Sequence, residues 1–230
     1  MSLFKSKEIS FPVEYDKNCH FHEDFLIMDN EIYPYNELTL ILYTGNSKAM
    51  NGVTLNHKIQ MNLFFSDKEY FSYPLPPENE FYNATAEFEY QRGVIPTNAI
   101  LGKKIEFIYE YLMNKTFENR LKKHLIALKE FGKFTVFNEF YIFHDNGDIY
   151  DNDKFMGNFR ERFEKNKLIN GLSYGGYSNK TNDPFVYGFE KGTKFLGLIS
   201  DNFEFRNIIN RDVMFALFNN LYKTGKMSGN

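Results

Sequence analysis

The order of strand-like and helix-like segments occurs twice in this chain, and this repetition constrains the fold more than any local motif. A strand-rich stretch from residue 8 leads into a helical pattern at residues 99–130, and a second from residue 133 leads into one at residues 210–223. An internal repeat sets the architecture before local motifs do. We therefore predict two consecutive α+β domains, residues 1–131 and 132–230, each a small, mainly antiparallel sheet or partly open barrel with a C-terminal helix.

Hairpin signals occur at corresponding places in the two halves. In the first half, apolar runs flank the turn pair Asp29-Asn30, and in the second half a similar run leads into Asn146-Gly147. Such pairs favour the tight turns of β-hairpins. Further strands are predicted at residues 8–13, 38–43, 53–55, 58–65, 87–90, 134–136, 139–143, 185–189 and 194–199. Loops or turns are predicted at residues 45–52, 70–82, 171–182 and 201–202, and residues 154–165 fit either a short helix or more sheet.

Both helical patterns have apolar residues about one turn apart. In the first pattern these residues are Ile105, Ile108, Leu112, Phe117, Leu121, Leu125 and Leu128. The step of five from Leu112 to Phe117 is compatible with a kink or break near Asn114. Thr97 or Asn98 is the predicted N-cap and Gly132 the predicted C-cap. Val213, Leu217 and Leu221 line one face of the second helix.

Composition places the chain among soluble globular proteins. The sequence is 43% apolar and 18% aromatic, which is too apolar for a disordered chain. A single cysteine, Cys19, excludes an intrachain disulfide. No run reaches the roughly 18–20 apolar residues that span a bilayer, and the N-terminus lacks the apolar core of a secretion signal. We expect a cytoplasmic protein, and the Asn, Lys, Phe and Tyr usage is typical of a low-GC bacterium or its phage.

The charges are unevenly distributed along the chain. The formal net charge of −3 argues against a nucleic-acid partner. Residues 1–97 hold 7 Lys/Arg against 14 Asp/Glu, whereas residues 98–133 hold 8 against 4. Six basic residues of the first helix are candidates for a binding face: Lys103, Lys104, Lys115, Arg120, Lys122 and Lys123. The favoured interpretation is a solvated helix whose lysines pair with interspersed glutamates, and the alternative is a basic face for an anionic partner.

Three local clusters fail as metal, calcium or phosphate sites. Cys19-His20-Phe21-His22 has too few ligands for structural zinc, and no second pair accompanies it. The carboxylate-rich stretch 145–153 has its glycine at the third position rather than the sixth, as a calcium loop requires. The glycine-rich stretch 171–177 lacks the order of a phosphate-binding loop. The sequence therefore predicts no cofactor, no metal and no catalytic residue.

Two segments carry a family resemblance. FGKFTVFNEFYIFHDNGD at 131–148 and FLIMDNEIYPYNEL at 25–38 resemble the opening hairpin of bacterial pleckstrin-homology-like domains. The resemblance extends over nearly the whole chain as a tandem pair. It implies partly open β-barrels, each closed by a C-terminal helix, and it fixes neither an enzyme activity nor a ligand. One departure is the acidic first hairpin, with Glu23, Asp24, Asp29, Glu31 and Glu37, where phosphoinositide-binding members generally have Lys and Arg.

The function hypothesis is a non-enzymatic, cytoplasmic binding or adaptor module for a protein partner, with the oligomeric state left open. The alternatives are an enzyme with a site in the groove between the domains, and an anionic-lipid-binding domain that uses the basic helix. The predicted partner contact is Tyr174, Tyr177, Phe185 and Tyr187, because tyrosine gives contact area at low entropic cost. A competing interpretation has Tyr174 and Tyr177 only covering the barrel mouth.

Overall fold

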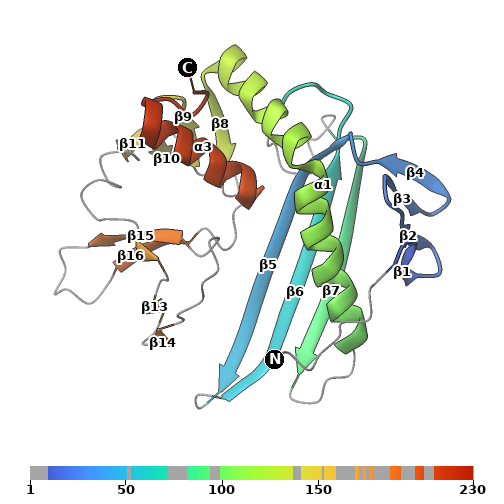
Figure 1. The fold of residues 1–230 in the computed structure, drawn as a ribbon. Coiled ribbons are helices and arrows are strands. Elements are labelled where there is room, and N and C mark those ends of the chain that lie inside the picture. Colours follow the sequence, from blue (N-terminus) through green and yellow to red (C-terminus); the bar gives the residue numbers. More distant parts are fainter. Residues whose placement is uncertain are drawn as a thin grey trace, which may run out of the picture.

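A computed structural model gives the fold of the chain (Figure 1). It describes residues 10–50, 53–71, 82–93, 99–136, 141–151, 153–158, 169–170, 173–174, 177–178, 187–192, 200–204 and 210–229. These residues form a mixed α+β structure with several small antiparallel sheets and two helices. The predicted fold class is confirmed at that level. The described sheets do not close into barrels.

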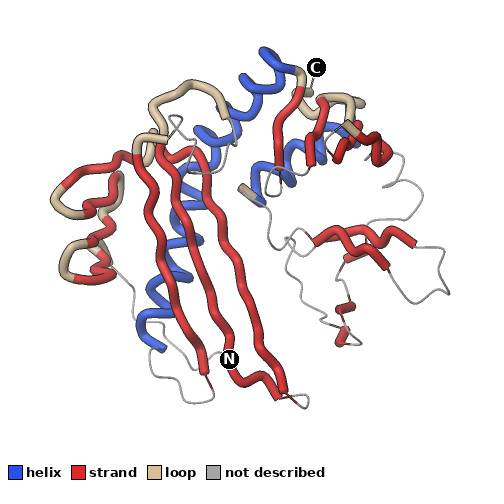
Figure 2. The backbone as a smooth tube through the Cα atoms, turned by 180° about the vertical axis from the view of Figure 1, so that it is seen from behind, coloured by secondary structure: helices blue, strands red, loops and turns tan. Residues whose placement is uncertain are grey.

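The first half contains two sheets and a long helix. The smaller sheet has the order β1-β2-β3-β4, with β1 Val13–Asp16, β2 Cys19–Phe21, β3 Phe25–Met28 and β4 Glu31–Pro34. The larger sheet has the order β5-β6-β7, with β5 Leu38–Met50, β6 Val53–Phe65 and β7 Ala84–Gly93. Helix α1, Ala99–Phe131, lies across one face of the larger sheet, and the smaller sheet lies beyond β7 (Figures 1 and 2).

The described residues of the second half form shorter strands and the helix α3. One sheet has the strand order β11-β10-β9-β8, with β8 Lys133–Val136, β9 Tyr141–His144, β10 Asp148–Asp151 and β11 Lys154–Asn158. A second sheet has the strand order β12-β15-β16, with β12 Ile169–Asn170, β15 Tyr187–Gly192 and β16 Ser200–Glu204. A two-stranded hairpin consists of β13 Ser173–Tyr174 and β14 Tyr177–Ser178, and the last helix is α3, Arg211–Thr224.

Turn and cap chemistry accounts for several confirmed boundaries. Asp29 and Asn30, between β3 and β4, have φ values of 53° and 69°. A type I′ hairpin turn requires two positive φ values, and Asp and Asn tolerate them. Gly132 has a φ of 69° and donates its N–H to the Leu128 carbonyl, which caps α1 as predicted. The helix continues through Asn114, and the N-cap candidates Thr97 and Asn98 lie outside the described residues.

Three loop predictions need correction. Residues 45–50 are strand rather than loop, because each pairs with β6 along a register that includes Gly45↔Ile59 and Ser47↔His57. Asp201 and Asn202 lie within β16, opposite Lys191 and Glu190, and do not form a turn. The predicted loop 171–182 contains the β13–β14 hairpin. In each case a neighbouring strand satisfies the backbone of a polar segment, so composition alone misjudged it. Residues 154–158 continue the sheet.

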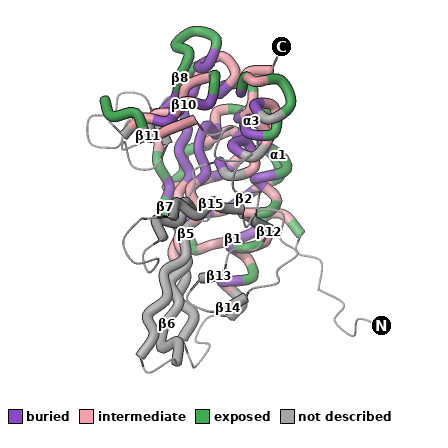
Figure 3. The backbone as a smooth tube through the Cα atoms, turned by 90° about the vertical axis from the view of Figure 1, so that its left-hand side faces the viewer, coloured by how far each residue is buried: buried purple, intermediate pink, exposed green. Residues whose placement is uncertain are grey.

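Two hydrophobic clusters build the interior. The first lies between the sheets of the first half and the N-terminal part of α1, and includes Phe21, Leu63 and Leu112. The second joins the two halves: Leu40 and Phe64 belong to it together with residues of β9, β10 and α3. Buried positions gather beside α1 and α3 in Figure 3. The halves therefore share a core, and the division at residue 131 stays a prediction.

Neither described helix carries an apolar stretch of the length that a membrane span needs. Within the described residues, no helix is both long and apolar enough to cross a bilayer.

Candidate functional site

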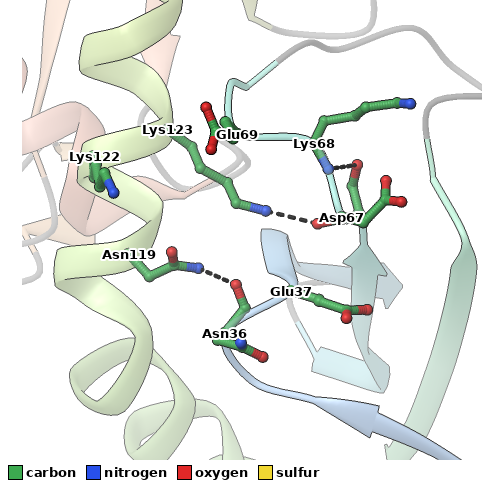
Figure 4. A pocket seen from close by; sticks show the side chains of 9 residues that line it. Asn36, Glu37, Asp67, Lys68, Glu69, Asn119, Lys122 and Lys123 are labelled. Carbon is green, nitrogen blue, oxygen red and sulfur yellow. Dashed lines mark hydrogen bonds between the residues drawn. The ribbon is translucent and has the colours of Figure 1, made fainter.

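A polar pocket of about 250 Å³ lies where α1 passes the β4–β5 turn and the segment after β6 (Figure 4). Three segments that are distant in sequence supply its lining: Asn36, Glu37, Ser66, Asp67, Lys68, Glu69, Asn119, Lys122 and Lys123. In Figure 4, Asn119 and Lys123 extend from the helix across the hollow toward the opposite chain segments. All of these residues belong to the first half of the chain.

Hydrogen bonds fix the three walls relative to one another. The Ser66 N–H donates to the Glu37 carbonyl at 2.9 Å, which joins the segment after β6 to the turn before β5. The Asn119 amide Nδ2 donates to the Asn36 carbonyl at 2.7 Å, which joins the helix to the same turn. Because main-chain groups accept these bonds, the pocket shape depends little on the flexible charged side chains.

Lys123 forms the buried floor of the pocket. Its residue is 5% exposed, and its Nζ donates to Thr39 Oγ1 and to the Ser66 carbonyl, each at 2.7 Å. Burial lowers the pKa of Lys123 to about 8, while the negative charges of Glu37 and Asp67 act in the opposite direction. These two bonds hold the ammonium group in the wall of the pocket.

The lining presents charges of both signs. Three carboxylates, on Glu37, Asp67 and Glu69, surround the same hollow as three lysine ammonium groups. No group of three or more His, Cys, Asp or Glu side chains capable of holding a metal occurs among the described residues. The mixed charges of the lining are suited to hydrogen bonding and charge pairing with a polar ligand.

The structure corrects the interpretation of the basic helix as a solvated face. Arg120 is 0% exposed and Lys123 is buried, so two of the six cations lie inside the protein. Lys104 donates to the Glu14 carbonyl at 2.8 Å, and Lys115 pairs with Asp24 at 2.8 Å. These contacts dock the β1–β4 sheet against α1. Two of the basic residues pair with carboxylates, Lys115 with Asp24 and Arg120 with Asp212.

Arg120 and its partners lie one turn of α1 away from Lys123. Its guanidinium donates to both carboxylate oxygens of Asp212, to Asn210 Oδ1, to Thr116 Oγ1 and to the Met113 carbonyl. Asn210, the N-cap of α3, donates from Nδ2 to the Thr39 carbonyl at 2.8 Å. Since Thr39 Oγ1 also accepts from Lys123, one buried network links the pocket floor to α3.

The sequence-predicted contact residues lie away from this pocket lining. Tyr174 and Tyr177 are opposite each other in the β13–β14 hairpin, and Tyr187 is opposite Asn170 in the β12–β15 pair. Phe185 lies outside the described residues. The Cys19 thiol is buried, and burial raises its pKa to about 12, so it is an inert packing group.

Sequence reasoning missed the pocket. It assigned no role to residues 66–69, and it interpreted Lys123, which is buried, as part of a solvated helix face. One signal was present, because Thr116, Arg120, Lys123 and Ala127 recur at spacings of three and four along α1. Residues at that spacing share one face of a helix. Three of the four are polar, so the sequence gave no reason to expect that this face is buried.

No family model, no curated protein and no solved structure matches this chain. The pocket and its network therefore have to be interpreted from their own chemistry.

Proposed function

We propose that this chain is a non-enzymatic, cytoplasmic binding module for a protein partner, and that the polar pocket is part of the contact. The observation that carries the proposal is the pocket lining, in which carboxylates and lysines from three segments converge. Protein surfaces present mixed charges, and complementary mixed charges give an interface its specificity. The excess of acidic residues in positions 1–97 would steer a partner with a basic face.

The pocket lining gives less support to the enzyme alternative. That alternative expected a site in the groove between the two halves, whereas the pocket is lined only by residues of the first half. Its most perturbed group, Lys123, has an amine pKa of about 8, which would suit a nucleophile. However, Nζ is held by Thr39 and Ser66 at 2.7 Å and is nearly inaccessible. We therefore assign Lys123 a positioning role in the pocket floor.

The anionic-lipid alternative required a free basic face on α1. Four of the seven basic residues of that helix are engaged with protein groups: Lys104, Lys115, Arg120 and Lys123. A polybasic membrane contact draws on several unpaired cations near the surface. The remaining cations are interspersed with carboxylates, which favours a protein partner over a lipid surface.

We also propose that the halves are a tandem pair of pleckstrin-homology-like units. The order of elements supports this proposal. In the first half a four-stranded sheet is followed by a three-stranded sheet and then a helix. Among the described elements of the second half the same order occurs, with the β13–β14 hairpin in addition. Fold alone fixes no ligand, so the partner class rests on the pocket.

Affinity capture of partner proteins by variants with a reversed charge in the pocket lining tests the proposed function. The full chain would be immobilised in wild-type form and as Asp67→Lys or Lys122→Glu, and incubated with lysate of the source cells. Matched controls are Lys103→Glu and Glu106→Lys, which reverse exposed charges elsewhere on α1. We expect a partner that both controls retain and that the pocket variants bind at least about tenfold more weakly, or roughly 1.4 kcal/mol.

The opposite result would exclude the pocket from the contact. If every captured protein binds the pocket variants as well as the wild type, the proposal in this form is wrong. The aromatic contact at Tyr174, Tyr177, Phe185 and Tyr187 stays a prediction, and Tyr174→Ala and Tyr177→Ala belong in the same experiment. Weaker capture at unchanged thermal stability would assign those tyrosines to the interface, and lost stability at unchanged capture would make them packing residues.

A further inference from the structure

Strand β5 forms one edge of the β5-β6-β7 sheet, and Asn210 pairs with the first part of that edge. The Asn210 N–H donates to the Ile41 carbonyl at 2.9 Å, and the Ile41 N–H donates to Asn210 Oδ1 at 2.8 Å. Asn210 Nδ2 donates to the Thr39 carbonyl at 2.8 Å. One residue thus supplies the donors and acceptor that a neighbouring strand would supply. The outer edge of β5 is therefore competent for strand pairing.

The bonds to Asn210 establish which backbone groups face outward along the rest of β5. In an antiparallel pair, alternate residues direct both N–H and C=O away from the partner strand. Ile41 is one of these outward residues, and the β5–β6 register is regular from Ile41 to Lys48. Gly45 and Ser47 therefore direct their N–H and C=O groups away from β6, whereas Thr44 and Asn46 direct theirs toward it.

Two features set the limits of the outward edge. Asn210 occupies it at Thr39 and Ile41, and the β5–β6 register shifts after Lys48. The extra residue at this bulge is Leu55 of β6, so the regular alternation that includes Ile41 extends to Lys48. Within the described part of the chain, no strand pairs with β5 on this side. In Figure 1, β5 is the outermost strand of its sheet on that side.

We propose that residues 44–48 of β5 accept an extended segment of the protein partner as an added strand. This inference rests on the proposed protein-binding function and names the mode of recognition. The argument for a partner segment is continuity, because it would extend an edge that the chain already pairs with Asn210. The sequence Thr-Gly-Asn-Ser-Lys is polar throughout. Main-chain hydrogen bonds, rather than apolar contacts, would supply the affinity, as in other cases of strand addition.

Proline substitution separates the outward groups from the inward ones. Proline has no N–H and is tolerated in edge strands where the N–H faces away from the sheet. Ser47→Pro therefore removes one outward donor while the β5–β6 pairing remains. Asn46→Pro is the matched control, because it removes a donor to β6 and is expected to lower thermal stability.

The binding probe is a library of random twelve-residue peptides displayed on phage, selected against the wild-type full chain. We expect selected peptides to bind Ser47→Pro about fivefold or more weakly, which corresponds to the loss of one hydrogen bond. Hydrogen exchange measured by NMR supplies a second test. The amides of Gly45 and Ser47 should become protected when the peptide binds, whereas those of Thr44 and Asn46 should already be protected in the free protein.

Each remaining outcome overturns the inference in a recognisable way. Failure to select any peptide, or equal binding to wild type and Ser47→Pro, would exclude strand addition at this edge. If a lysate partner is lost from the pocket variants but retained by Ser47→Pro, the proposed function stands and the edge is not its site. A wild-type dimer that Ser47→Pro converts to monomer in light scattering would identify a second copy as the occupant.

Discussion

Arg120 and Asp212 form a two-point ion pair that ties α1 to α3 across 92 positions of sequence. Arg120 Nη1 and Nη2 lie 2.7 and 2.6 Å from Oδ1 and Oδ2 of Asp212. The arginine side chain is 0% exposed and the aspartate side chain 11% exposed. Further donors on the guanidinium reach Thr116, Met113 and Asn210, so the buried charge is fully coordinated.

Replacement of Asp212 by Ala should strongly destabilise the protein. The change leaves the Arg120 guanidinium buried without its counter-charge, which costs about 3–5 kcal/mol in comparable buried pairs. Urea unfolding followed by circular dichroism measures the loss. The double variant Arg120→Met/Asp212→Leu should recover a large part of it, because it removes both charges together.

Lys115→Ala supplies the matched control for that experiment. Lys115 and Asp24 also form an ion pair, at 2.8 Å, but their side chains are 42% and 71% exposed. Exposed pairs contribute about 0–1 kcal/mol, so Lys115→Ala should change stability little. Equal losses for Asp212→Ala and Lys115→Ala would contradict the importance assigned to the buried pair.

His124 should make the protein sensitive to acid. It is 0% exposed and stacks on Phe71 with ring centroids 3.9 Å apart. Its Nδ1 donates to the Arg120 carbonyl at 2.8 Å, and no described residue hydrogen-bonds to Nε2. Burial, and to a lesser degree the positive charge of Arg120, lower the pKa of His124 to about 3.

The sign of the pH dependence follows from that shift. The folded pKa lies below the unfolded value of about 6.5, so between these values the unfolded chain binds a proton that the folded chain does not. Stability is fully present above about pH 6.5 and should fall by up to about 1.4 kcal/mol per pH unit as the pH decreases toward 3. Urea unfolding at pH 7.5, 6, 5 and 4 measures this. The slope should be smaller in His124→Leu, and an identical slope in both proteins would rule out His124 as its source.

Gly147 should be less replaceable than Gly132, although both have positive φ. The φ values are 87° and 69°. A Cβ at Gly147 would lie 2.7 Å from Cδ2 of Leu221 in α3, whereas a Cβ at Gly132 would meet nothing within 4 Å. Gly132→Ala should cost about 1–2 kcal/mol for the left-handed backbone alone. Gly147→Ala should cost more, because it adds an overpacking penalty of about 1–3 kcal/mol.

Thermal unfolding of the two glycine variants checks this order. Each should melt below the wild type, with Gly147→Ala the lower of the two. A second variant, Leu221→Ala in the Gly147→Ala background, should lose less stability than the sum of the single changes, because the contact that causes the clash has been removed. Additive losses would show that Leu221 moves aside without cost.

Much of the first half was readable from local pattern. The hairpin at Asp29-Asn30 and the strand predicted at residues 58–65 occur where the sequence predicts them, the strand as part of β6. Helix α1 ends at its predicted glycine. These features depend on turn chemistry and periodicity over a few residues, which a sequence displays directly. The strand at 45–50 was missed because its stability comes from pairing with β6 rather than from its own polar residues.

The pocket and the buried network were not readable in this way. The apolar stripe of α1 was predicted to continue through Leu121 and Leu125, but these residues are only partly buried, whereas Arg120, Lys123 and His124 are buried. Polar side chains are buried when partners satisfy them. For Arg120 and Lys123 the distant partners are Thr39, Ser66, Asn210 and Asp212, between 57 and 92 positions away.

The sequence by itself determined the elements: antiparallel hairpins, a long helix with a glycine cap, and the repeated order of strands and helix. Tertiary structure decided which face of α1 is buried, where the pocket lies and how α3 joins the first half. The physical reason is the range of the interactions. Turns, caps and periodicity act within a few residues, whereas the cost of burying Arg120 or Lys123 is offset only by groups that folding brings to them.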